Sequence, residues 1–458
     1  MNVYKIMTAS EKRSVISLAL LYASRMLGLF MVLPVFVLYG QELAGSSEIL
    51  IGVAIGAYGL SQALFQVPFG ALSDRFGRKK LIFFGLLLFL IGSLVAALST
   101  TIYGVIFGRF LQGAGAIASV LMALLSDLTS EESRTKSMAI IGMSIGVSFS
   151  VALVIGPLVG SVLGLQGIFW FTAVLALFGM FWLYFFVPNP VQSASDRNTR
   201  LFKSQLMDVL KHKELVRLDI GIFALHLCLT ALFIAVPMSL LNKINMPGED
   251  HWLVYLTVMV TSFFAMVPFI IIGEKKQKMK PVFLFAILLL LASSLSFSLT
   301  QNQFLYFWLS LFFYFMAFNL LEASLPSLVS KICPAGSKGT AMGVYSTCQF
   351  FGAFVGGVLG GWVLSSYDES GVYLLVSIVC LGWFLFARGM ANPSSETGMT
   401  LSFSALADSQ AQEITDRLSS VGGVEEVVLV PEDKVAYLKV IKGKLNQQEL
   451  DSVMECYR

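Results

Sequence analysis

Four side chains that carry a charge, or can gain one, occur inside long apolar stretches of the sequence: Arg25, Arg109, His226 and Glu322. An ionisable group in hydrocarbon is costly, so each is expected to face a cavity or a partner. Glu322 is the only carboxylate near the middle of an apolar stretch, and burial disfavours its ionised form, as a proton carrier requires. His226 has a side chain that titrates near neutral pH. These residues predict a proton-binding site.

Each of these residues also has a structural interpretation. His226 would then be a hydrogen-bonded histidine in helix packing, and Glu322 would form an ion pair with Arg109 or Arg25. Arg25 would either attract an acidic substrate or hold a neighbouring helix. The sequence alone leaves these alternatives open.

The composition places these residues in a membrane protein. Hydrophobic residues make up 56% of the chain, charged residues 13%, and the mean hydropathy is +0.79, far outside the range of soluble domains. Twelve stretches are long enough to cross roughly 30 Å of hydrocarbon as helices. They are residues 13–39, 50–72, 80–99, 102–126, 138–163, 167–187, 218–241, 252–273, 281–300, 303–329, 339–366 and 371–389.

The distribution of basic residues indicates how these stretches are oriented. If the N-terminus is cytoplasmic, the loops of the opposite side hold only Lys243 out of the 31 lysines and arginines. This asymmetry follows the positive-inside rule and predicts that both termini are cytoplasmic. The net charge of +3 is therefore a topology signal and does not indicate a nucleic-acid partner. The first apolar run is longer than the core of a signal peptide, so we expect it to stay in the membrane.

A charged loop, GALSDRFGRK at residues 70–79, connects the second and third stretches. Gly70 lets another helix approach closely, and Gly77 permits a tight turn with positive φ. Asp74 is a candidate cap for a helix N-terminus, where a carboxylate meets unpaired N–H groups. Arg75 and Arg78 would also serve as anchors at the inner face of the membrane, but anchoring does not explain Asp74 or the glycines.

The fifth stretch contains Gly156 and Pro157. Proline removes one backbone hydrogen bond, and Gly156 and Gly160 belong to a stripe of small residues at four-residue spacing, which permits close helix packing. We expect this stripe to seal against the eleventh stretch or its neighbours, because that stretch has a matching stripe. Its members are Cys348, Gly352, Gly356 and Gly360. The alternative is ordinary packing of membrane helices.

Three segments of the chain resemble motifs of the major facilitator superfamily, and the resemblance covers residues 1 to about 390. Gly70-x3-Asp74-Arg75-x-Gly77-Arg78-Lys79 resembles its loop signature, and RFLQGAGAIA (109–118) resembles its fourth-span motif. GPLVGS (156–161) resembles the fifth-span motif of its drug/proton antiporter branch, although that motif usually ends in two glycines and Ser161 stands at the second position here.

The resemblance implies an all-α fold of twelve helices in two six-helix bundles, in a bacterial inner membrane. It implies a protein, most often a monomer, that exports a small molecule in exchange for protons and uses no cofactor. In the superfamily, the residue matching Asp74 holds the eleventh span in the outward-open state, the match of Arg78 pairs with that of Asp127, and the match of Arg109 takes part in proton coupling. An uptake symporter or facilitator, and a transporter-shaped receptor that signals to a partner, are the alternatives.

The chain contains a repeat and divides into five parts. Residues 66–80 align with 266–280, which places Glu274 at the position of Asp74. We therefore predict an N-terminal bundle at 1–187, a cytoplasmic linker at 188–217 and a C-terminal bundle at 218–390. A flexible connection at 391–398 and a small soluble domain at 399–458 follow.

The soluble part has the pattern βαββα, which predicts a ferredoxin-like domain. Ser409 with Gln412 and Asn446 with Glu449 are predicted to cap its two helices. Residues 422–440 resemble heavy-metal-associated and other ferredoxin-like regulatory modules, but the chain lacks the CxxC that binds metal in that family. The five cysteines form no CxxC pair, so we expect no metal site. Regulation and passive stabilisation remain alternative roles for this domain.

Overall fold

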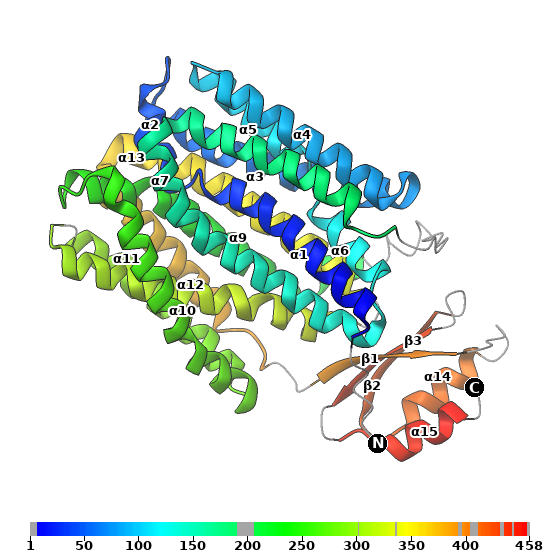
Figure 1. Cartoon of the computed structure of the whole chain (residues 1–458). Helices are drawn as coiled ribbons and strands as arrows, with labels where there is room; N and C mark the ends of the chain where they lie inside the picture. The colour runs from blue at the N-terminus through cyan, green and yellow to red at the C-terminus, as the bar shows by residue number, and fades with distance from the viewer. Residues whose placement is uncertain are drawn as a thin grey trace.

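The structure is a computed structural model that describes residues 7–189, 206–300, 302–334, 337–392, 396–403, 411–430, 435–441 and 444–455. A helical membrane part is followed by a small domain of strands and helices (Figure 1). The membrane part comprises α1 Ala9–Phe30, α2 Phe36–Tyr39, η1 Gly40–Glu42, α3 Glu48–Phe76, α4 Arg78–Leu98, α5 Ile102–Ala114, α6 Ala118–Asp127, α7 Glu131–Phe185, α9 Lys213–Asn242, η2 Gly248–Asp250, α10 His251–Lys275, α11 Met279–Thr300, α12 Phe304–Ile332 and α13 Lys338–Ala387.

Ten helices in the described part are long and apolar enough to cross a membrane. Two of these stretches, in α7 and α13, have 50 residues each and would measure about 75 Å as straight helices. Each is divided by one residue with non-helical backbone angles, Gly164 in α7 and Asp368 in α13. Counting both parts of each gives twelve crossing segments, so the predicted all-α membrane fold is confirmed.

The fourth predicted stretch forms two helices, α5 and α6, where a single helix was expected. The chain leaves the helix at Gly115, which packs against the backbone of Gly85 in α4 so closely that a Cβ would overlap it. The carbonyl oxygen of Gly115 accepts a hydrogen bond from Arg25 Nη2 at 2.6 Å. This oxygen also accepts a hydrogen bond from the backbone N–H of Ile117 at 2.8 Å, so Arg25 adds a tertiary contact at the break.

The two glycine stripes pack inside their own halves, which differs from the expectation that they seal against each other. A Cβ on Gly156 of α7 would lie 2.5 Å from the carbonyl oxygen of Met31, at the end of α1. Gly352 and Gly356 of α13 lie directly against the backbone of α9. The four-residue spacing thus predicted close packing correctly, but it carries no information about which helix is the partner.

The halves contact each other through other glycines. Gly52 of α3 and Gly357 of α13 touch backbone to backbone, and Gly361 packs on the carbonyl of Glu48. These contacts lie toward the face of the membrane part at which α3 begins, here called the opposite face. The N-terminal face is the one at which α1 and α13 begin and α3 ends.

Near the N-terminal face the corresponding surfaces are open. A Cβ on Gly142 or Gly146 of α7, or on Gly339 or Gly343 of α13, would meet no heavy atom within 4 Å. Among the described glycines, close contacts between the halves therefore lie toward the opposite face, and these four near the N-terminal face form none.

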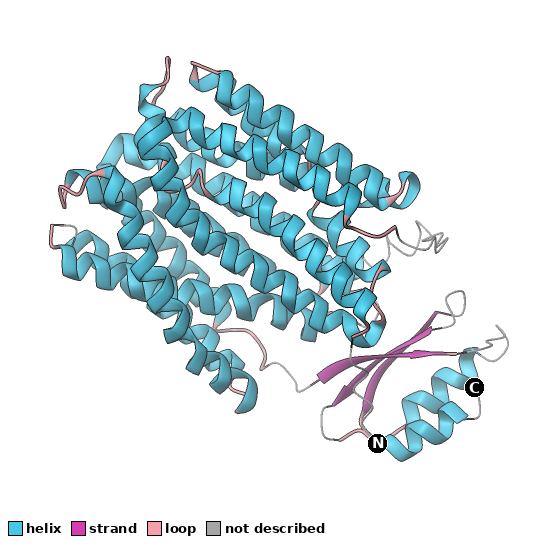
Figure 2. Cartoon of the chain, in the orientation of Figure 1, coloured by secondary structure: helices cyan, strands magenta, loops and turns pink. Residues whose placement is uncertain are grey.

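The small domain consists of β1 Glu396–Ser402, α14 Ala411–Ser420, β2 Val424–Val430, β3 Val435–Ile441 and α15 Gln447–Glu455 (Figure 2). Its antiparallel sheet has the order β1-β3-β2, and alternate residues of β3 are buried, in a cluster with Ile414 and Leu418 of α14. This order of elements matches the predicted βαββα pattern.

Local features of the small domain and the linker refine the predicted boundaries. Asn446 Oδ1 accepts a hydrogen bond from the backbone N–H of Glu449 and caps α15, whereas Ser409 lies outside the described residues. β1 begins inside the stretch 391–398, and α9 begins inside the stretch 188–217. Lys439 Nζ of β3 lies 3.5 Å from the carbonyl oxygen of Ile332, where α12 ends. The domain thus touches the membrane part at its N-terminal face.

Candidate functional site

Three side chains from three helices of the second half form a short hydrogen-bonded chain. Gln349 of α13 lies between His226 of α9 and Glu322 of α12. Its Nε2 atom is 2.9 Å from His226 Nε2 and donates to Glu322 Oε1 at 3.2 Å. His226 Nε2 is also 3.9 Å from Glu322 Oε2. Two residues predicted separately from the sequence are therefore brought together by an amide.

The Glu322 carboxylate is incompletely satisfied. Its Oε2 atom is buried and has no hydrogen-bond partner among the described residues, although 36% of the side chain is exposed. His226 is 8% exposed and cannot be solvated as a free imidazole would be. An unpaired buried carboxylate oxygen is costly, and binding a proton there removes the uncompensated charge. The arrangement can therefore hold a proton on Glu322 beside a second titratable group.

An aromatic cluster separates this chain from the opposite face. The ring of Phe318 lies 6.0 Å from that of His226, and Phe149 of α7 lies 5.9 Å from Phe318. Phe149 also contacts rings of both halves. The cluster consists of Phe30, Phe149, Phe233, Phe315 and Phe318. These side chains pack the two halves together at the level of Phe318, one helical turn before Glu322 in α12.

The two buried arginines lie in the first half and do not pair with Glu322. Arg25 donates to Gln62 Oε1 at 2.9 Å and to the carbonyl of Gly115, and Arg109 Nη1 donates to Gln112 Oε1 at 2.9 Å. The Arg109 guanidinium also lies 5.2 Å from the centre of the Tyr58 ring. Of the alternatives raised by the sequence, these contacts favour a role for Arg25 in holding a neighbouring helix. The proton-coupling role of Arg109 remains a prediction.

A buried carboxylate that the sequence did not single out lies near this chain. Asp219 of α9 is 6% exposed and has no hydrogen bond or ion pair among the described residues. Tyr345 of α13 is close enough to interact electrostatically with both Asp219 and Glu322. Asp219 stands at the second position of the predicted span 218–241, where a carboxylate is ordinarily solvated. Only its burial in the structure distinguishes it.

The charged loop has the local geometry that its residue types predict. Gly77 has φ 93°, ends α3 and precedes α4. Arg78 pairs with Asp74 at 2.5 Å and, through Nε, with Asp127 Oδ2 at 3.1 Å. Arg75 is exposed, and its guanidinium lies 5.6 Å from the Phe76 ring. The loop therefore ties α3 and α4 to the end of α6.

The described partners of Asp74 and the described neighbours of Gly70 lie in the first half. Asp74 pairs with Arg78, and the nearest atom to a Cβ on Gly70 belongs to the Ser119 side chain at 3.5 Å, an ordinary distance. The close approach expected at Gly70 is thus absent in this state.

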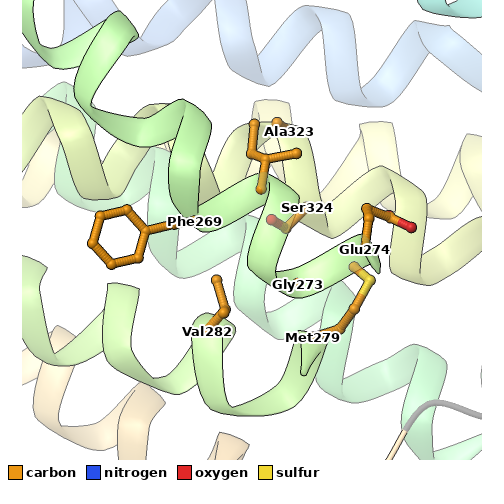
Figure 3. A pocket seen from close by; sticks show the side chains of 8 residues that line it. Phe269, Gly273, Glu274, Met279, Val282, Ala323 and Ser324 are labelled. Atoms are coloured by element: carbon orange, nitrogen blue, oxygen red, sulfur yellow. The ribbon is translucent and has the colours of Figure 1, made fainter. Parts of the chain in front are cut away.

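The second half has a counterpart of this ion pair. Glu274, aligned with Asp74, accepts two hydrogen bonds of 2.9 Å from Lys331 Nζ and one of 3.2 Å from Ser327 Oγ. A cavity of about 30 Å³ lies beside Glu274 and is lined also by Met279 and Ser324 (Figure 3). It has room for about one water molecule, so it is too small to be a substrate site.

The described residues contain no group of three or more His, Cys, Asp or Glu side chains that could hold a metal ion. Cys228 and Cys380 lie together, with their sulfur atoms 3.8 Å apart, although they are far apart in the sequence. Both are fully buried in helix packing between α9 and the last part of α13. The structure thus gives these cysteines a packing environment.

Comparisons with known proteins agree with this architecture. The sequence profile described as Major Facilitator Superfamily matches residues 18–357 and 280–399. The chain is 45% identical over 455 residues to the inner membrane transport protein YajR of Escherichia coli, covering 99% of both chains. It is 23% identical over 366 residues to the quinolone resistance protein NorA of Staphylococcus aureus, covering 78% of this chain and 91% of that protein.

A solved structure shows the same fold. A bacterial homologue of the human lysosomal transporter Spinster, in an inward-facing and unoccupied conformation, superposes with a TM-score of 0.68 at 12% identity. The match covers 84% of this chain and 98% of that chain. The profile match and the full-length identity to YajR establish that this chain is a membrane transport protein of the major facilitator superfamily.

Proposed function

We propose that this protein exports a small molecule in exchange for protons, and that Glu322 carries the proton. The observation that carries the proposal is the unpartnered Oε2 atom of Glu322, linked through Gln349 to His226. Neutralising this oxygen with a proton removes a buried, uncompensated charge. The relative named for quinolone resistance supports export as the direction of transport.

Alternating access follows from the two packing interfaces. The described state is closed at the opposite face by the contact of α3 with α13 and by the Phe149 cluster. In the other state these contacts open and the C-terminal end of α3 approaches the N-terminal end of α13, which brings Asp74 to the beginning of α13. Protonation of Glu322 would favour one state because the two states differ in how well they bind the proton.

The membrane setting follows from the same proposal. The N-terminal face is cytoplasmic, because the basic residues lie at that face, and the membrane is the bacterial inner membrane. Substrate enters the separated halves from the cytoplasm and leaves through the opposite face. The protein acts as a monomer, with the lipid bilayer, the substrate and protons as its partners.

Transport by purified protein in liposomes tests the proposal. A fluoroquinolone is a reasonable first probe because of the relative's name. Accumulation should require a pH gradient and should run opposite to the proton flow. Accumulation in the direction of proton flow would indicate a symporter, and accumulation independent of the gradient would indicate a facilitator.

A further inference from the structure

Asp219 is placed beside the proton site by the packing of α9 on α13. The backbone of Phe223 lies against Gly352, and the backbone of Leu227 lies against Gly356, so the two helices run side by side in parallel. One turn earlier, the same register puts Asp219 beside Cys348. The electrostatic interaction of Asp219 with Cys348 agrees with this placement.

The described groups that interact with Asp219 are neutral. They are Tyr345 and Cys348 of α13, and Tyr345 also interacts electrostatically with Glu322 of α12. The nearest basic residue along α9, Arg217, is used elsewhere: it pairs with Glu214 and lies 5.8 Å from the Phe386 ring. Asp219 therefore has no cation that would compensate an ionised carboxylate among the described contacts.

The position of Asp219 along its helix is between Glu322 and the N-terminal face. α9 begins at Lys213, so Asp219 is six residues, or about 9 Å, from the start of the helix. Glu322 is ten residues, or about 15 Å, from the end of α12 at the same face. The Tyr345 hydroxyl, buried and without a hydrogen-bond partner among the described residues, lies near both carboxylates.

We propose that Asp219 is a second proton-binding carboxylate, which receives the coupling proton from Glu322 and releases it at the N-terminal face. The O–H bond at Glu322 breaks as an O–H bond forms at Asp219, and the Tyr345 hydroxyl or a water molecule carries the proton between them. Asp219 then loses the proton to water between the separated halves. Net charge at the pair does not change during the transfer, which avoids a second buried anion.

This inference rests on the proposed function, since it concerns the route of the proton that Glu322 is proposed to carry. A group that is only structural would keep one protonation state over the working pH range. A proton carrier must change its state. The two possibilities predict different changes in the protonation of Asp219 with pH, and this change can be measured without a substrate.

Infrared difference spectroscopy of the full-length protein in lipid measures that change. Spectra would be compared between about pH 6 and about pH 9, above the range in which exposed carboxyl groups titrate. The C=O stretching band of a neutral carboxyl group should appear at the lower pH for both residues. Asp219→Asn should remove one band and Glu322→Gln the other. Asp208→Asn, at an exposed aspartate, should leave both bands unchanged.

Tyr345→Phe tests whether the two carboxylates communicate. In a protein that keeps Tyr345, Glu322→Gln should shift the pH at which the Asp219 band appears. The same substitution should cause a smaller shift when Tyr345→Phe is also present. If Asp219→Asn does not fold, Asp219→Glu serves in its place, because its band should move to the frequency of a glutamic acid while the number of bands stays at two.

The outcomes separate this inference from the proposed function. A spectrum of Asp219→Asn identical to the wild type, with the Glu322 band present, overturns the role of Asp219 and leaves the proposed function intact. If the spectrum of Glu322→Gln keeps both bands, the proposed function is overturned instead. An Asp219 band that responds to added sodium chloride at constant pH, and not to pH, would identify a cation site and also overturn the proton role.

Discussion

His226 and Glu322 lie 3.9 Å apart, Nε2 to Oε2, and share the carboxamide of Gln349 as a common hydrogen-bond partner. The three residues come from α9, α12 and α13, so their distances depend on how these helices pack. The proposed proton site is thus linked through Gln349 to α13, the helix that contacts α3 at the interface between the halves. Movement of α13 would change both the site and the interface.

Replacement of Gln349 tests this link. Gln349→Leu removes both hydrogen bonds and leaves the buried His226 ring without this partner, which costs about 1–3 kcal/mol, and less at the partly exposed Glu322. We expect a lower thermal unfolding temperature and loss of pH-dependent transport. Gln412→Leu, at an exposed position of the small domain, is the control and should change neither. Full pH-dependent transport by Gln349→Leu would show that the amide is dispensable.

A single added methyl group at the interface can test the contact between the halves. Gly357→Ala would place a Cβ 2.5 Å from the carbonyl oxygen of Gly52, across the interface and outside the core of either half. We expect the protein to fold and its population to shift toward the state that is open at the opposite face. The distance between spin labels at Ser46 and Ser365, which lie near that face in different halves, should increase.

The control for this change is another glycine of the same helix. A Cβ on Gly382 of α13 would meet no atom within 4 Å, so Gly382→Ala should leave the label distance unchanged. An unchanged distance in Gly357→Ala would mean that α3 and α13 separate enough to admit the methyl group without leaving the closed state.

The charged loop offers a comparison within one motif. Arg78→Ala breaks the pairs with Asp74 and Asp127, and we expect it to lower the free energy of unfolding by about 1 kcal/mol, since these groups are partly exposed. Arg75→Ala removes only a ring contact of an exposed residue and should have a smaller effect. Thermal unfolding of the purified protein in detergent measures the difference. Equal effects of the two variants would argue against a structural role of the Arg78 pairs.

The small domain should be separable from the membrane part. Deletion of residues 391–458 removes a domain with its own core, whose described contacts with the membrane part include the Lys439 contact with Ile332. We expect the truncated protein to fold and to keep at least part of its transport activity. Complete loss of transport with an intact membrane part would favour an obligatory signalling or gating role for the domain.

The sequence predicted the membrane helices well because each depends on local composition. The alternation of apolar and polar residues in the strands of the small domain and the positive φ at Gly77 are also local properties. The pairing of Arg78 with Asp127 was anticipated from the family resemblance and not from spacing. His226 and Glu322, which the structure brings together, were singled out because charge is rare in apolar stretches.

What the sequence could not supply depends on packing between distant segments. Gln349 is uncharged and separated from His226 by 123 residues, so no pattern singles it out. Asp219 was missed because its position near the start of a span gives no sign of burial. The break at Gly115 depends on Gly85 and Arg25, which belong to other helices. Glycine spacing likewise identified a packing face but not the helix that covers it.

The most direct test of the central claim compares two kinds of transport by Glu322→Gln in liposomes. The glutamine side chain keeps the shape of the carboxyl group but cannot release a proton, so accumulation driven by a pH gradient should be lost. Exchange of labelled for unlabelled probe without a gradient should persist, because it needs no net proton movement. Glu249→Gln, at an exposed glutamate, should retain both. Gradient-driven accumulation by Glu322→Gln at the wild-type level would contradict the assignment of Glu322 as the proton carrier.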